Sequence, residues 1–383
     1  MDKFIKLTVI RINLCNVLIS STYIKLYLYW FYILQVSRHC FYIFNSVGVF
    51  GGIGSFSDNQ PQDIVEYALY PWFMALLFLL AGMSSRWALE NKTAREWWKS
   101  RCLKLLVPST IGLFVLQWVV GYFNALPGMA EFSSLPTPAK YIIFAVSGIG
   151  PLWFIQLLWL YSLILLGLRK LDSKDKFYDV CGNIFSTRIG VAMLLLIFFF
   201  LSWGGSMLTS YDAPLMGLYR IPFYIVPFLF GYYVFSQDKV LDNFSTKGPY
   251  AAVLFVLMVV LYAWRWYPQN YTSGAVQQDW STMLFATMGS VCLLAVFRCY
   301  FDRSSSLTKF MSKRSFGIYV LHYLPLIVLA TMLKRTAISP VWIYLILIVC
   351  VPVLSVALYE LISRIPFVRW AVLGIKKPKE PKL

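Results

Sequence analysis

The stretch "GIGPLWFIQLLWLYSLILL", residues 148–166, indicates what kind of protein this is. It contains no Asp, Glu, Lys or Arg, and its length is close to the ~20 residues that an α-helix needs to cross about 30 Å of hydrocarbon. The Gly and Pro residues at its start indicate a shaped turn, and Trp153 has the place of an aromatic anchor at a membrane interface. The stretch therefore predicts a transmembrane helix that enters from the outer side.

The rest of the chain has the same character. Of its 383 residues, 59% are hydrophobic and only 13% are charged, whereas soluble domains contain about 25% charged residues. Its apolar runs are too long for strands and too apolar for helices that face water. Ten such runs lie near residues 14–44, 64–85, 105–125, 148–168, 189–208, 220–236, 250–267, 281–301, 315–333 and 341–362. We therefore expect an all-α, polytopic transmembrane bundle of about ten helices.

Charge in the connections orients the bundle. The connections after the second, fourth, eighth and tenth spans are rich in Lys and Arg, whereas "SFSDNQPQD", "PGMAEFSSLPTP", "TSYDAP" and "YPQNYTSGAVQQDW" are poor in them. The positive-inside rule then predicts that both termini face the cytoplasm. No small-x-small cleavage pattern follows the basic N-terminus, which favours a retained first span over a signal peptide. We expect an atypical segment that begins the first helix (1–35), one transmembrane domain (36–370) and a basic tail (371–383).

Composition also argues against several functions. The 34 Lys and Arg residues exceed the 17 Asp and Glu residues, but in a membrane protein such an excess sets topology and meets anionic lipid, so the expected partner is the bilayer and not nucleic acid. The seven cysteines form no CxxC pair and no cluster at metal spacing, so neither a disulfide framework nor a metal site is expected. GxSxG, Walker A, HExxH and GxGxxG motifs are absent from the sequence.

The chain has only two histidines, and the first is His39. It follows Arg38 near the outer end of the first span. Two interpretations are open at this point. His39 is either an interfacial side chain beside a snorkelling arginine, or a general base, because imidazole titrates near neutrality.

The second histidine, His322, lies inside an apolar span. Helical spacing places it on one face with Ser315 and Tyr319, as a polar stripe. This stripe either joins neighbouring helices or lines a polar cavity. Pro325 predicts a kink at the same place, because it has no N–H for the helix.

Basic side chains provide two further candidate sites. Six of them gather at the cytoplasmic edge of residues 78–109: Arg86, Lys92, Arg95, Lys99, Arg101 and Lys104. They either bind the phosphates of a cofactor or set topology. At the outward edge of the sixth span, Arg220 is either a snorkelling anchor or a binding group for an anionic substrate.

Several stretches from about residue 38 to the end, taken in order, resemble one family. They are "RHCFYIFNS", "LFLLAGMSSRWALENKTAREWWKSRCLKLLVP", "GPLWFIQLLWLYSLIL", "IPFYIVPFLFGYYVF", "SFGIYVLHYLPLIVL" and "LYELISRIPFVRWAVLGIKK". Their order and spacing resemble the membrane-bound acyltransferase 3 family, and within it the branch of glucans biosynthesis protein C, which is similar to a succinyltransferase for periplasmic glucans. The resemblance implies an O-acyltransferase of the bacterial inner (plasma) membrane. Its acyl-CoA would be a co-substrate and not a bound cofactor, and its acceptor would be an extracytoplasmic glycan.

The resemblance also implies roles for particular residues. His39 aligns with a histidine that family members carry in their first helix and that is taken to be catalytic. Donor phosphates would meet Arg86, Arg95, Lys99 and Arg101 at the cytoplasmic side. Arg220 would bind the acceptor or an acyl carboxylate, and residues of possible support are Lys25, Arg38, Trp153, Tyr319 and His322.

The first helix departs from the family pattern. Family members carry an arginine eleven residues before the histidine, but Leu28 stands there, and Lys25 is the nearest substitute on a similar helix face. This departure leaves an inactive homologue as one alternative, or a start of the sequence that differs from that of the family. A transporter or flippase of an anionic or lipid-linked solute is another alternative, with Arg220 as its binding group.

Overall fold

The computed structural model describes residues 63–300 and 306–376, and this part of the chain consists of helices without strands. Within it, nine helices are long and apolar enough to cross a membrane: Ile64–Glu90, Ala94–Ala125, Leu152–Leu171, Arg188–Met207, Gly217–Phe235, Gly248–Trp266, Trp280–Tyr300, Arg314–Leu333 and Pro340–Arg364. They match the second to tenth predicted spans, so the predicted polytopic helix bundle is confirmed. The predicted first span, near 14–44, lies outside the described residues.

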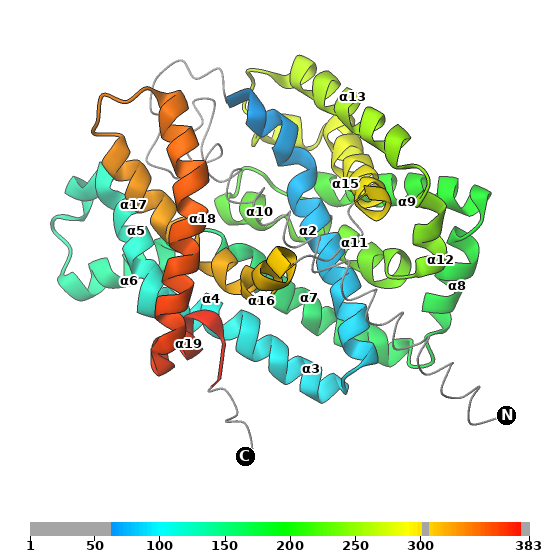
Figure 1. Cartoon of the computed structure of the whole chain (residues 1–383), viewed down its shortest axis with the longest axis horizontal. Helices are drawn as coiled ribbons and strands as arrows, with labels where there is room; N and C mark the ends of the chain where they lie inside the picture. The colour runs from blue at the N-terminus through cyan, green and yellow to red at the C-terminus, as the bar shows by residue number, and fades with distance from the viewer. Residues whose placement is uncertain (1–62, 301–305, 377–383) are drawn as a thin grey trace.

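Some spans are single helices and others are built from segments, labelled as in Figure 1. The single helices are α2 (Ile64–Glu90), α7 (Leu152–Leu171), α9 (Arg188–Met207), α13 (Gly248–Trp266), α15 (Trp280–Tyr300) and α18 (Pro340–Arg364). The segmented spans contain α3 (Ala94–Arg101), η2 (Cys102–Leu106), α4 (Val107–Gly112), η3 (Leu113–Gln117) and α5 (Trp118–Ala125), then α10 (Pro214–Tyr219), α11 (Ile221–Phe230) and η5 (Gly231–Phe235), then α16 (Ser306–Leu321) and α17 (Tyr323–Leu333). Shorter elements in the connections are η4 (Leu126–Phe132), α6 (Thr137–Ser147), α8 (Lys176–Phe185), α12 (Asp238–Leu241), η6 (Asp242–Phe244), α14 (Gly274–Gln277) and α19 (Pro366–Leu373).

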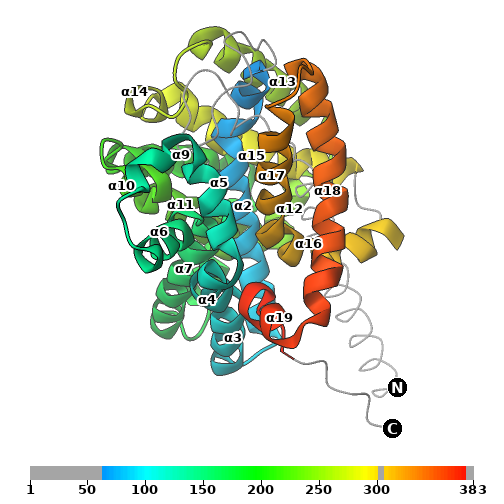
Figure 2. The same ribbon diagram turned by 90° about the vertical axis from the view of Figure 1, so that its left-hand side faces the viewer.

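Helix α2 runs through the middle of the bundle, with other helices around it in both views (Figures 1 and 2). In the most apolar 18-residue stretch of α2, 67% of the residues are buried. The corresponding fractions are 22% for α13 and 28% for α18. A helix that is apolar all round is expected at the centre, whereas apolar side chains that remain exposed on α13 and α18 suit contact with lipid.

Close approach of α11 and η5 to α2 depends on two glycines. A Cβ atom added to Gly82 would lie 1.9 Å from the carbonyl oxygen of Phe228, and one added to Gly231 would lie 2.0 Å from the carbonyl oxygen of Leu79. Each helix thus presents a glycine to the backbone of the other, which is the small-residue packing that brings membrane helices close together.

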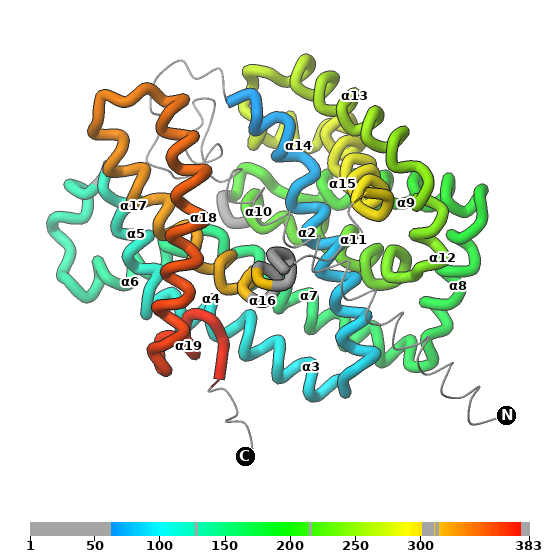
Figure 3. Tube along the Cα trace, viewed as in Figure 1, coloured from blue at the N-terminus to red at the C-terminus, as the bar shows by residue number. Residues whose placement is uncertain are grey.

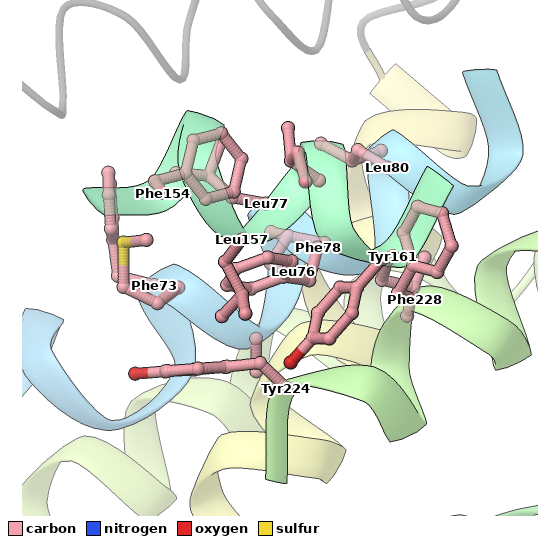
Figure 4. Packing of buried hydrophobic residues seen from close by; sticks show 14 of the residues in the cluster. Phe73, Leu76, Leu77, Phe78, Leu80, Phe154, Leu157, Tyr161, Tyr224 and Phe228 are labelled. Atoms are coloured by element: carbon pink, nitrogen blue, oxygen red, sulfur yellow. The ribbon is translucent and has the colours of Figure 1, made fainter. Parts of the chain in front are cut away.

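Aromatic rings fill the space between α2, α7 and α11 (Figure 4). The ring of Phe78 stacks on Tyr224 at 4.7 Å and meets Phe154 edge-on at 4.7 Å and Tyr161 at 5.5 Å. Tyr161 also packs against Phe228. These rings attach the helix that contains residues 152–166 firmly to the central helix.

The second of the nine spans begins earlier than predicted. We expected residues 86–104 to form a cytoplasmic connection, but a continuous helical run begins at Ala94 and reaches Ala125 (Figure 3). A capping box explains this start: Thr93 Oγ1 accepts from the Glu96 N–H, and the Glu96 carboxylate accepts from the Thr93 N–H. The expected shaped turn before α7 is present, with Gly150 at φ +43°.

The expected kink near Pro325 is also present, as a break in the helix. Helix α16 ends at Leu321 and α17 begins at Tyr323, so His322 lies at the joint. Because Pro325 has no N–H, the carbonyl of Leu321 has no helical donor there. The break therefore lies where the sequence predicts it.

Candidate functional site

Arg220 lies between α10 and α11 with left-handed backbone geometry, at φ +43°, and is 5% exposed. Its Nη1 donates to Gln277 Oε1 at 2.5 Å, its Nη2 to the Tyr70 hydroxyl at 2.5 Å and its Nε to the Gly217 carbonyl at 3.0 Å. The guanidinium also lies 5.3 Å from the ring centre of Tyr211. Left-handed backbone geometry is unfavourable for a residue with a Cβ atom. At Arg220 it is stabilised by the three hydrogen bonds that the buried guanidinium donates.

Gln277, which orients Arg220, is itself fixed by its neighbours. Its side-chain Nε2 donates to the backbone carbonyl of Tyr271, and its backbone carbonyl accepts from Ser206 Oγ at 2.8 Å. Ser206 also bonds to the Tyr211 hydroxyl at 2.7 Å. The connection that precedes α15 therefore holds one side of the arginine, and α2 holds the other through Tyr70.

Trp153 connects this cluster to α7. Its ring lies 6.2 Å from that of Tyr219, the residue before Arg220, and the Tyr219 hydroxyl donates to Gln156 Oε1. The amide of Gln156 in turn donates to the Ser109 carbonyl at 3.0 Å. Gln156 is thus the link between α4, α7 and the Arg220 cluster.

Tyr319 contacts the start of α7, and His322 lies beside Tyr319. The Tyr319 hydroxyl donates to the Pro151 carbonyl at 2.5 Å, and the Tyr319 ring lies 5.6 Å from Phe154 and 5.8 Å from His322. His322 is completely buried, with Nδ1 2.6 Å from the Tyr319 carbonyl oxygen. A carbonyl only accepts, so Nδ1 carries the proton, and in neutral imidazole Nε2 is then the basic nitrogen.

Arg86 lies near the other end of α2. Its Nη1 and Nη2 donate to the two carboxylate oxygens of Asp175 at 2.7 and 3.2 Å, and its Nε donates to Glu90 at 3.0 Å. The guanidinium lies 3.7 Å from the ring centre of Tyr178, and burial raises the pKa of that phenol. Bidentate pairing of this kind fixes the turn between α7 and α8 against α2.

The other predicted donor-side residues are arranged differently. Arg101 donates from Nη2 to Ser85 Oγ at 2.8 Å and lies over the Trp97 ring at 4.9 Å. Arg101 thus contacts α2 at Ser85, the residue before Arg86. Arg95 and Lys99 are exposed on α3, outside this contact.

The structure therefore groups the predicted residues at two levels of the bundle. Arg220 meets Tyr70 in the second turn of α2, and Arg86 follows sixteen residues later, which is about 24 Å along a helix. Trp153, Tyr319 and His322 lie with the Arg220 cluster, joined to it through α7. The predicted catalytic His39 and its predicted supports Lys25 and Arg38 lie outside the described residues, so their roles stay predictions.

Several partners in these clusters were not found by sequence reasoning. Tyr70, Gln277 and Asp175 carry no local signal, because each meets its arginine only through the fold. Gln156 likewise meets Ser109 and Tyr219 only through the fold. A second amide, Gln117, donates to the Val320 carbonyl at 3.2 Å and also escaped notice.

Among residues 63–300 and 306–376, no group of three His, Cys, Asp or Glu side chains is placed to hold a metal ion.

Comparison with known proteins shows which family the chain resembles. A family model described as an acyltransferase domain, of the acyltransferase 3 type, matches residues 36–360. No curated protein and no solved structure matches the chain closely enough to count as a relative.

Proposed function

Because the chain belongs to the acyltransferase 3 family, and is thus an acyltransferase that acts on groups other than amino-acyl groups, we propose that it transfers succinyl or acetyl from acyl-CoA to a glycan. The acceptor is a hydroxyl of an extracytoplasmic glycan, a glucan in the first instance, and the membrane is the inner membrane of a bacterium. The family match, which covers most of the chain, carries this proposal.

In the proposed reaction His39 takes the proton of the acceptor hydroxyl. The hydroxyl oxygen then forms a bond to the thioester carbonyl carbon, the carbon–sulfur bond breaks, and the coenzyme A thiolate leaves and takes up the proton. Acyl-CoA is consumed as a co-substrate, and no permanently bound cofactor enters the scheme.

The two polar levels of the bundle support a reaction that joins two compartments. The basic residues Arg101, Arg95 and Lys99 lie toward the end of α2 that carries Arg86, where the phosphates of a cytoplasmic donor would be met. The Arg220 cluster lies about 24 Å away along α2, on the side from which a glycan would approach.

Arg220 is proposed to bind a carboxylate of the acyl group or of the acceptor. Its guanidinium is held in one orientation by Gln277 and Tyr70, and a fixed guanidinium is suited to bidentate recognition of a carboxylate. Trp153, Tyr319 and His322 are proposed as supporting residues on the same side.

The decisive experiment replaces His39 with alanine and measures acyl groups on periplasmic and surface glycans by mass spectrometry. We expect glycan acylation to be lost while the variant stays in the membrane at wild-type level, because no other residue is proposed to take the hydroxyl proton. Acylation that persists in the variant would remove His39 from the role of base.

The same assay separates the alternatives. With a labelled acyl donor, the enzyme places label on the glycan, whereas a transporter or flippase moves an intact solute and leaves the glycan unlabelled. Wild-type protein that does neither would be an inactive homologue, in keeping with Leu28 at the position of the family's arginine.

A further inference from the structure

Helix α8 (Lys176–Phe185) has no part in the proposed reaction, and its side chains face three different environments. With ten residues it is about 15 Å long, too short to span a bilayer. It joins the end of α7 to the start of α9 and runs across them at the edge of the molecule (Figure 1). Its place beside Arg86, in a connection rich in basic residues, puts it at the predicted cytoplasmic surface.

One side of α8 packs on the protein. Cys181 and Gly182 are buried, and a Cβ atom on Gly182 would lie 1.8 Å from Gln237 Oε1. Gln237 Nε2 donates to the Tyr178 carbonyl at 2.7 Å. Burial raises the pKa of the Cys181 thiol to about 11, so this face is uncharged at neutral pH. These contacts fix how the helix is rotated about its axis.

A second side is apolar and exposed. Phe177, Val180 and Ile184 are 56%, 50% and 45% exposed. At ~100° per residue they fall within an arc of about 60°. The remaining exposed side is polar and carries Asp179 and Asn183, about 100° round the helix from the centre of the apolar arc. An apolar stripe beside a polar face is typical of a helix that lies in a membrane surface.

Exposed apolar side chains also lie on the transmembrane helices before and after α8. Two connecting residues separate α8 from α9, and the exposed side chains of α9 include Ile189, Met193 and Leu196. Leu171, the last residue of α7, is also exposed. Because α9 is apolar enough to span the membrane, its exposed apolar side chains suit contact with hydrocarbon, and α8 precedes this helix directly in the chain.

Charges around α8 favour an anionic surface. Exposed Lys170, Lys174, Lys176 and Arg188 flank the helix at both ends. The acidic residues of this segment are partly engaged, since Asp175 is paired with Arg86 and Asp172 accepts from the Phe177 and Tyr178 N–H groups. Basic side chains near an anionic leaflet are attracted to its headgroups.

We propose that α8 is an in-plane anchor whose apolar stripe of Phe177, Val180 and Ile184 inserts into the cytoplasmic leaflet, with its flanking lysines and arginine on anionic headgroups. The anchor is joined to the predicted donor side, because Asp175, which precedes α8, holds Arg86. Contact with the leaflet thereby fixes the turn that positions this arginine.

The test uses the full chain in vesicles of phosphatidylethanolamine and phosphatidylglycerol. A photoreactive p-benzoylphenylalanine replaces Val180, Ile184 or, as the matched control on the polar face, Asp179. After irradiation, mass spectrometry counts lipid adducts, and we expect at least about fivefold more at Val180 and Ile184 than at Asp179. Size-exclusion profiles equal to wild type show that each variant is folded.

Equal lipid labelling at all three positions would overturn the insertion of the stripe, and so would crosslinks from Val180 to a second copy of the chain. Among the lipid adducts, phosphatidylglycerol should exceed its share of the bilayer. An adduct ratio equal to the bulk ratio would overturn the role of the flanking charges.

Discussion

Arg86 and Arg101 both have partners at the end of α2 that carries Arg86, but these partners differ in kind. Arg86 gives three N–H groups to two carboxylates, whereas Arg101 gives one to the neutral hydroxyl of Ser85. A guanidinium already engaged by carboxylates has fewer donors left for a phosphate than one bonded to a hydroxyl. Of the two, Arg101 is therefore the stronger candidate for the donor site, and Arg86 has a clear structural role.

Replacing each arginine with glutamine should separate these roles. Arg86→Gln should lower the free energy of unfolding by about 1–2 kcal/mol, a value discounted for screening because Asp175 and Glu90 are 37% and 39% exposed. Arg101→Gln should instead raise the KM for the acyl donor by about tenfold, the loss of one charged contact. Thermal unfolding in detergent and donor-dependent kinetics measure the two effects.

The matched control is Asp175→Asn. If Arg86 is structural, this variant and Arg86→Gln should lose similar stability, and the double variant should lose little more. An Arg86→Gln protein that unfolds normally but has a raised donor KM would reverse the assignment of Arg86.

At the scale of elements, the contact between α2 and the α11–η5 span fixes the geometry of the bundle. Gly82 and Gly231 allow the two backbones to touch, and the rings around Phe78 fill the space beside them (Figure 4). This contact also sets the direction in which α11 leaves Arg220. A change in the spacing of these helices would therefore move the Arg220 cluster relative to Tyr70 on α2.

Replacing Gly82 with alanine should be strongly destabilising. The added Cβ would lie 1.9 Å from a backbone oxygen, so the helices would have to separate, at a cost of roughly 1–3 kcal/mol or more. Gly167→Ala in α7 is the matched control: apart from its chain neighbours and the backbone of its own helix, no atom lies within 4 Å of its Cβ position, and alanine stabilises a helix interior by about 0.5–1 kcal/mol relative to glycine. Thermal unfolding of both variants checks this, and equal unfolding temperatures would contradict the proposed packing.

At the scale of the whole molecule, the two ends of the bundle differ in charge. The basic segments α3, α19 and the α7–α8 turn lie at one end of the membrane-spanning helices (Figure 1). At the other end, the connection between α13 and α14 carries no Lys or Arg, although the connection between α17 and α18 carries Lys334 and Arg335. This arrangement agrees with the orientation that the positive-inside rule predicts. The predicted donor side and the Arg220 cluster lie at different levels of this bundle.

Reporter fusions should show this orientation. Alkaline phosphatase fused after Leu383 should be inactive, because it folds only outside the cytoplasm, while green fluorescent protein at the same place should fluoresce. The control is alkaline phosphatase inserted after Arg335, in the outward connection before α18, which should be active. An active phosphatase at Leu383 would invert the topology and with it the assignment of donor and acceptor sides.

The second to tenth spans and their order could be predicted from the sequence by itself, because hydrocarbon accepts only long apolar helices and this requirement is local. The break at His322 was predictable for the same reason, since a missing N–H at Pro325 acts within one turn. The helical start at Ala94 was missed, although Thr93 and Glu96 formed a readable capping box.

Only the tertiary structure decided which polar groups meet. Arg86 is paired with Asp175, which lies 89 residues away in the sequence, and Arg220 donates to Gln277, which lies 57 residues away. In the same way, the contacts of Gln237 with Tyr178 and Gly182 decide which side of α8 is buried and which sides are exposed. Such pairings depend on how whole helices pack and turn, and no local pattern of residues encodes them, so the sequence could name the arginines as candidates but not their partners.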